Sequence, residues 1–109
     1  MNYSKEEEKY FSLIRYIRDD HDYIICSEMS SLIQSGIDVN MKNPYGLTML
    51  TIATQFVGKH TKEIMQILIN AGADLNAQNK EDGTPIMVAI RYGGDYTIDM
   101  LRILINAGA

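Results

Sequence analysis

The sequence ILINAGA at residues 67–73 returns unchanged at residues 103–109, 36 positions later. One further step back of the same length finds Leu32, Ile33 and Gly36, so two large aliphatic residues, a short spacer and a glycine occur at three evenly spaced places. A period of about 20–50 residues is typical of solenoids, in which each unit buries its apolar face against its neighbours. The sequence therefore predicts a stack of similar units.

Length and charge narrow the class of protein. The 109 residues, 46% of them hydrophobic, suffice for one domain with a modest core. The net charge of -4 argues against nucleic acid as a partner, because phosphate contacts require a basic surface. No segment approaches the roughly 20 apolar residues of a membrane span, and the acidic start is unlike a signal peptide. The single cysteine, Cys26, allows no intrachain disulfide and indicates a reducing, cytoplasmic setting.

Residues 1–35 are expected to form two antiparallel helices. Ser4 and Glu7 have the spacing of a capping box at the start of a first helix, which we expect to reach about residue 20. A second apolar pattern follows and ends at Gly36, a suitable left-handed stop. This pair lacks the Thr-led start of the later units, so we interpret it as an atypical N-terminal cap.

Two further units, residues 36–71 and 72–109, align along their whole length. Each begins with a turn segment rich in Asp, Asn and Gly, which we call a finger. Thr48 and Thr84 then stand where a helix N-cap is expected, and Pro85 suits the first helical position. Identical residues occur in loops and helices alike: Gly36/Gly72, Asp38/Asp74, Asn40/Asn76, Asn43/Asn79, Thr48/Thr84, Ala53/Ala89, Gly58/Gly94 and Thr61/Thr97.

The helical part of each unit predicts close stacking. Ala53 and Ala89 lie at the centre of the first helices, where a methyl group permits close backbone approach between units. The second helices, about residues 61–71 and 97–107, are apolar on most sides and are therefore expected in the interior.

Four segments in phase match repeat motifs. They are Thr48–Ala53 and Thr84–Ala89 (Thr-Pro-Leu-His-x-Ala), Gly72–Asn76 (Gly-Ala-Asp-Val-Asn) and Asn43–Thr48 (Asp-x-x-Gly-x-Thr). Together they resemble the ankyrin repeat over residues 36–109, with residues 1–35 as an atypical first unit. The resemblance implies an all-α solenoid of stacked helix-turn-helix units with β-turn fingers, in one domain over residues 1–109.

The sequence also departs from the family pattern. The period exceeds the usual length of about 33 residues, and the additional residues fall between the helices, around residues 57–60 and 93–96. The signature histidine, which links neighbouring fingers in the family, is replaced by Thr51 and Met87. In the second finger Asp82 takes the usual place of glycine, which predicts a distorted tip.

We expect no catalytic residues, no metal site and no cofactor. No nucleophile or acid–base pair has the arrangement of an active site. His21 lies in an acidic stretch and His60 in an inter-helix connection, and both are interpreted as surface residues. Cys26 falls on an apolar helix face and is interpreted as a small hydrophobic residue.

The resemblance implies that a partner binds at the fingertips and the exposed side of the first helices. Aromatic residues and Arg on such a surface are frequent anchors of protein interfaces. An alternative for Phe56 and Tyr92, which align with each other, is packing beneath the lengthened connection. The residues implied are Pro44, Tyr45, Leu47, Gln55, Phe56, Lys80, Glu81, Arg91 and Tyr92.

The last unit has no polar cap after it, so its apolar residues are expected to face water or a neighbour. They are Val88, Ile90, Ile98, Leu101 and Ile105. The leading interpretation is a non-catalytic protein-binding module, an adaptor or scaffold. The alternatives are a homodimer formed through the C-terminal unit, a fragment of a longer array, or a regulatory part of a larger enzyme or effector.

Overall fold

The computed structural model describes residues 3–13, 22–56, 58–81 and 83–109. Helices and turns, without a strand, make up these residues, which confirms the all-α prediction. The elements are α1 (Lys5–Ser12), α2 (Asp22–Gln34), α3 (Met49–Gln55), α4 (Thr61–Asn70), α5 (Pro85–Tyr92), the 3₁₀ turn η2 (Gly94–Tyr96) and α6 (Thr97–Asn106).

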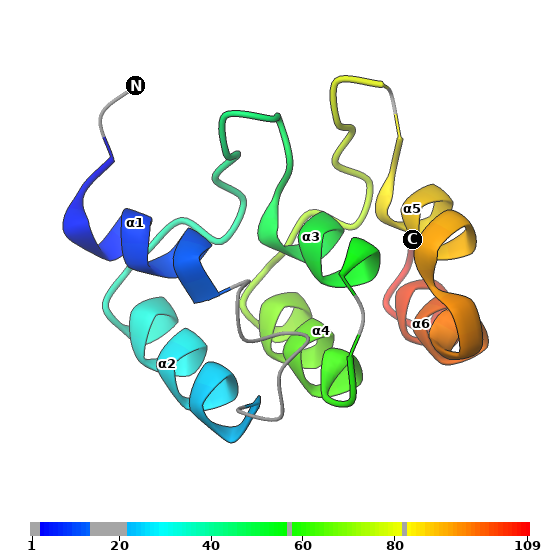
Figure 1. The fold of residues 1–109 in the computed structure, drawn as a ribbon, viewed down its shortest axis with the longest axis horizontal. Coiled ribbons are helices and arrows are strands. Elements are labelled where there is room, and N and C mark those ends of the chain that lie inside the picture. Colours follow the sequence, from blue (N-terminus) through cyan, green and yellow to red (C-terminus); the bar gives the residue numbers. More distant parts are fainter. Residues whose placement is uncertain (1–2, 14–21, 57, 82) are drawn as a thin grey trace.

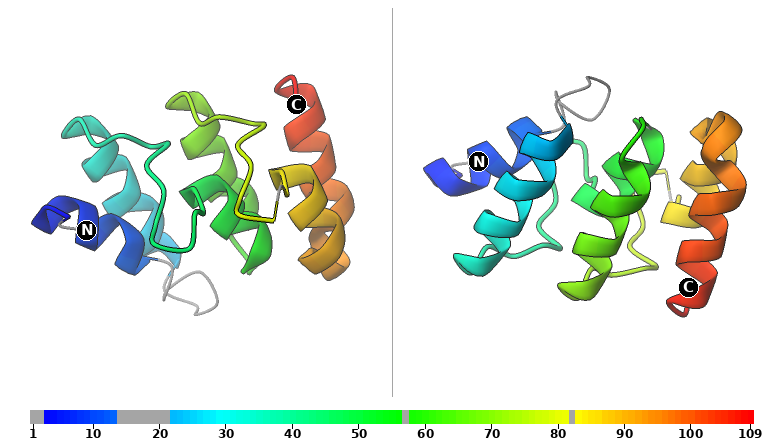
Figure 2. Two further views of the ribbon diagram at one scale, coloured as in Figure 1. Left: turned by 90° about the horizontal axis from the view of Figure 1, so that it is seen from above. Right: turned by 90° about the horizontal axis from the view of Figure 1, so that it is seen from below.

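The helices form pairs that stack side by side in two rows (Figure 1). One row contains α1, α3 and α5, the other α2, α4 and α6, and within them α3 packs on α5 while α4 contacts both α2 and α6. The first finger (residues 36–47) and the second finger (residues 72–83) rise from the same side of the stack (Figures 1 and 2). The predicted solenoid is therefore confirmed.

The second helix of each pair ends in the same way. After α4, the N–H of Ala73 donates to the carbonyl of Leu68 (3.0 Å), and after α6 the N–H of Ala109 donates to that of Leu104 (2.9 Å). This is the Schellman arrangement, in which a left-handed residue ends the helix. Glycine has no Cβ to oppose that conformation. The left-handed residues are Gly36 (φ 96°), Gly72 (φ 93°) and Gly108 (φ 108°), so the two ILINAGA segments end their helices alike.

The predicted helix starts are confirmed. Ser4 and Glu7 make both bonds of the capping box, Glu7 N–H to Ser4 Oγ (3.1 Å) and Ser4 N–H to Glu7 Oε1 (2.7 Å). Thr48 and Thr84 are N-caps, but only the Thr48 hydroxyl accepts a backbone N–H, at 3.3 Å. The expected continuation of the first helix falls largely on residues 14–21, outside the described part of the chain.

Equivalent residues of the two units fill the core. Ala53 and Ala89 are both fully buried, as the stacking argument predicted. The larger buried side chains that repeat 36 positions apart are Ile64 with Met100, and Leu68 with Leu104. Gly93 is buried where α5 turns towards α6, and a Cβ there would collide with the Ala89 carbonyl oxygen.

Val88 was expected to face water or a neighbour at the end of the stack, and this expectation was wrong. This residue is only 7% exposed, because it lies on the side of α5 that faces α3 rather than on the outer side. Leu101 is half-buried. Ile90, Ile98 and Ile105 are 61%, 65% and 59% exposed, in agreement with the expectation.

Candidate protein-binding groove

An asparagine side chain shapes each fingertip. The side-chain oxygens of Asn43 and Asn79, which occupy equivalent positions, each accept two backbone N–H groups within their own finger. The donors are Tyr45 (2.9 Å) and Leu47 (3.0 Å) in the first finger, and Glu81 (2.9 Å) and Gly83 (2.8 Å) in the second. Such Asx turns fix the tip backbone without a sheet. Asp82, for which a distorted tip was predicted, lies outside the described residues.

Side chains link the two fingers to each other. The Asn40 side chain donates to the Gly72 carbonyl (3.1 Å) and accepts the Asp74 N–H (2.6 Å). Two lysines add further links, from Lys42 to the Gln78 carbonyl (3.0 Å) and from Lys80 to the Pro44 carbonyl (2.9 Å). The fingers are therefore joined without the signature histidine. At its position, the Thr51 hydroxyl instead lies 3.2 Å from that of Thr48.

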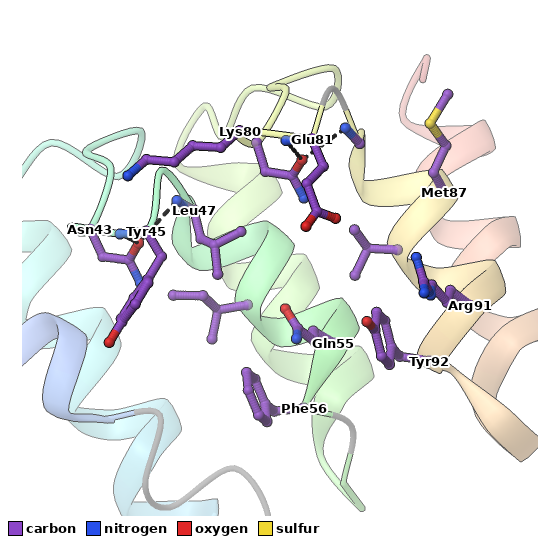
Figure 3. A pocket seen from close by; sticks show the side chains of 14 residues that line it. Asn43, Tyr45, Leu47, Gln55, Phe56, Lys80, Glu81, Met87, Arg91 and Tyr92 are labelled. Carbon is purple, nitrogen blue, oxygen red and sulfur yellow. Dashed lines mark hydrogen bonds between the residues drawn. The ribbon is translucent and has the colours of Figure 1, made fainter.

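Between the fingers and the helices α3 and α5 lies a groove of about 780 Å³ (Figure 3). Residues from both units line it. They are Asn43, Tyr45, Leu47, Ile52, Gln55, Phe56, Asn79, Lys80, Glu81, Gly83, Met87, Val88, Arg91 and Tyr92. Eight of the nine residues implied by the resemblance are thus brought together, while Pro44 is exposed at the fingertip beside the groove.

The floor of the groove is apolar and its edges are aromatic. Ile52 and Val88, at equivalent positions in α3 and α5, are 1% and 7% exposed. Tyr45 is 75% and Tyr92 45% exposed, whereas Phe56 is half-buried and packs against the core. The alternative for both residues, packing beneath the lengthened connection, does not describe Tyr92, which is exposed.

Sequence comparison with the family did not single out Ile52, Val88, Met87 or the two asparagines as lining residues. The repeat itself could have pointed to four of them, because Ile52 and Val88, and likewise Asn43 and Asn79, occupy equivalent positions 36 residues apart. Met87, which is 56% exposed, takes the place of the signature histidine.

The described residues contain no group of three or more His, Cys, Asp or Glu residues that could hold a metal ion. His60 is half-buried, and its Nδ1 lies 3.3 Å from the Glu63 carboxylate. Cys26 is half-buried against the core, with Sγ 3.8 Å from Glu63 Oε2. His21 lies outside the described residues. Within the described part, every helix is too short or too polar to cross a membrane.

A second surface is formed by the outer side of α5 and α6. We define the terminal face as Met87, Ile90, Ile98 and Ile105, which are 56–65% exposed. One repeat earlier, the positions of Met87 and Ile90 are occupied by Thr51 and Thr54, which are 1% and 0% exposed in α3. The side of α3 that carries Thr51 and Thr54 is covered because α5 packs against α3. The equivalent side of α5, which carries Met87 and Ile90, is exposed to solvent.

Comparison with known proteins agrees with this architecture. A search of curated proteins returned no match to the chain. The family model for ankyrin repeats, described as three copies, matches residues 23–109, which include α3 to α6, both fingers and nearly all of α2. The chain belongs to the ankyrin-repeat family.

Proposed function

We propose that this chain is a non-catalytic adaptor or scaffold that binds a protein partner in the groove between the fingers, α3 and α5. Ankyrin repeats are generally protein–protein interaction modules and are typically non-catalytic. The observation that carries the proposal is the convergence of Tyr45, Arg91 and Tyr92 on one groove with an apolar floor. Exposed Tyr and Arg beside buried apolar residues are typical of interface hot spots.

The groove is held open before any partner arrives. Asn40, Lys42 and Lys80 join the fingers, and the tip backbones are fixed by Asn43 and Asn79. A surface ordered in advance loses less conformational entropy on binding than a flexible one. The scaffold therefore favours a partner bound with little rearrangement of the fingers.

The proposal is tested by capture of partners from cell extract with the purified chain as bait. The variant Tyr45→Ser/Arg91→Ala/Tyr92→Ser removes the exposed anchors, and its folding is checked by thermal melting. A matched variant, Gln66→Ala/Arg102→Ala, changes exposed residues of α4 and α6 outside the groove. We expect the first variant to lose partners that the second retains. Partners retained equally by both folded variants would contradict the assignment of the groove.

A second candidate function is self-association through the terminal face. It is supported by the exposure of four large apolar residues in the last two helices, Met87, Ile90, Ile98 and Ile105, since exposed apolar surface frequently marks interaction sites. A two-fold dimer would place this face against its own copy. Sedimentation across a concentration range should show dissociation of a dimer, and Ile90→Lys/Ile98→Lys should leave a monomer. A wild-type chain that is monomeric at every concentration excludes this candidate.

The two ends of the stack and the cellular location complete the proposed role. We propose that residues 1–35 act as the polar cap, which is supported by the exposed residues of its helices: Lys5, Glu6, Glu8 and Lys9 in α1, and Ser27, Ser31 and Gln34 in α2. The lone Cys26 supports a reducing, cytoplasmic location. Whether the chain is part of a longer array, or the regulatory part of a larger enzyme, is tested by the reading frame beyond Ala109.

A further inference from the structure

The two ends of the groove differ in chemistry. The end at the fingertips contains Tyr45 and the carboxylate of Glu81. The opposite end is formed by the last residues of α3 and α5, which contribute Gln55, Arg91 and Tyr92 (Figure 3). The fingertip end therefore carries the Glu81 carboxylate and the Lys80 ammonium, whereas the opposite end carries the Arg91 guanidinium, which forms no ion pair with any described residue, and the apolar floor lies between them.

Most other polar groups of the groove are already engaged. The side-chain oxygens of Asn43 and Asn79 hold their own fingertips, and the ammonium group of Lys80 donates to a backbone carbonyl. By contrast, the side chains of Gln55 and Arg91 make no hydrogen bond or ion pair with any residue that the structure describes. These two groups remain available to a ligand.

The conformation of Arg91 suits a planar anion. Its Cζ lies 5.6 Å from the centre of the Tyr92 ring, within cation–π distance, and its N–H groups make no hydrogen bond with any described residue. A guanidinium binds a carboxylate through two parallel N–H···O bonds, a geometry that Lys cannot offer. The Gln55 amide, at the same end of the groove, supplies a further N–H donor.

We infer that the groove binds an extended segment of a protein partner in which an Asp or Glu side chain meets Arg91 and a neighbouring apolar side chain covers Ile52 and Val88. This inference rests on the proposed function and specifies the partner of the same groove. The orientation follows from the charges, because the segment's carboxylate is attracted to Arg91, whereas at the far end the Glu81 carboxylate offsets the attraction of Lys80.

A carboxylate fits these charges better than a phosphate does. Among the described residues, Lys80, Glu81 and Arg91 are the charged residues that line the groove, and the Lys80 ammonium is engaged with Pro44. Phosphate recognition in peptides generally relies on clusters of Arg. One available guanidinium, with a carboxylate at the other end, matches a single negative charge.

The test selects ligands from a random peptide library displayed on phage, with the purified full chain as bait. Parallel selections use Arg91→Ala and, as the matched control, Arg102→Ala, an exposed arginine of α6 outside the groove. We expect an Asp or Glu beside an apolar residue to be enriched by the wild-type chain and by Arg102→Ala, but not by Arg91→Ala. Absence of any selected peptide, or enrichment that survives Arg91→Ala, overturns the inference.

The selected peptide is then measured by fluorescence anisotropy. Arg91→Ala should weaken binding about tenfold or more, as expected when a charge-assisted contact is lost. Glu81→Gln should strengthen it, an effect that a merely structural Arg91 would not predict. Tighter, Arg91-dependent binding of a phosphoserine version of the peptide would refute the carboxylate assignment. Peptides that require Tyr45 but show no acidic preference would overturn this inference and leave the proposed function standing.

Discussion

Replacement of Asn40 by alanine should loosen the connection between the two fingers, and the repeat provides its own control. The Asn40 side chain makes two hydrogen bonds to the second finger, to the Gly72 carbonyl (3.1 Å) and from the Asp74 N–H (2.6 Å). Asn76 occupies the same position one unit later, where its side chain makes no hydrogen bond with any described residue.

The expected decrease in the free energy of unfolding follows from these two hydrogen bonds. A typical intramolecular hydrogen bond contributes about 0.5–1.5 kcal/mol net, which gives about 1–3 kcal/mol for two. Gly72 and Asp74 are exposed, so water can replace the lost partner, and we expect about 1–2 kcal/mol for Asn40→Ala. Asn76→Ala should stay within about 0.5 kcal/mol of the wild type, as is usual for a surface substitution.

The assay is urea-induced unfolding of both variants, monitored by circular dichroism. A loss of 1 kcal/mol in a domain of this size corresponds to a decrease of about 4–8 °C in Tm, so thermal melting gives an independent measurement. Because any intrinsic preference of Asn for this turn is common to both positions, the difference between the variants isolates the bonds between the fingers. Equal losses for Asn40→Ala and Asn76→Ala would refute the reasoning.

A helix cap, a buried tyrosine and a buried glycine can each be tested by substitution. In urea unfolding, Thr48→Ala should lower the free energy of unfolding by about 1 kcal/mol and Thr84→Ala by only a few tenths of a kcal/mol. The reason is that the Thr48 hydroxyl caps its helix and the Thr84 hydroxyl does not. Burial, with a smaller effect from a nearby carboxylate, raises the pKa of Tyr10 above its ordinary value of 10.0. The native state therefore retains a proton that the unfolded chain releases, and the free energy of unfolding should fall as the pH rises above about 10. Tyr10→Phe should reduce this fall and the exposed Tyr45→Phe should not; an identical pH dependence in both variants would contradict the assignment. Gly93→Ala should destabilise by about 1–3 kcal/mol through overpacking, and an unchanged Tm would show that the backbone there can shift.

Much of the fold could be predicted because the sequence repeats its local signals. Ser4 with Glu7 marked the first helix, and the glycines that end α2 and α4 marked two others, since caps and left-handed stops depend on neighbouring residues alone. The surface position expected for Val88 was wrong because burial depends on the direction of a helix face. Helical spacing alone did not show that this face of α5 turns towards α3.

The groove was predictable in its residues but not in its chemistry. The family resemblance brought together Tyr45, Arg91 and Tyr92, all of which line it. Sequence could not show that the ammonium group of Lys80, from the same set of residues, donates to a backbone carbonyl, while the Arg91 guanidinium bonds to no described residue. That distinction depends on the distance between two fingers, which no local pattern specifies.

The bonds between the fingers have a consequence for how such a protein can change over evolution. Asn40, Lys42 and Lys80 all reach main-chain atoms of the opposite finger. A main-chain carbonyl is present whatever side chain the residue carries, so substitution at a fingertip leaves these bonds available. Selection for a new partner can therefore replace the residues that face it without rebuilding the framework that presents them.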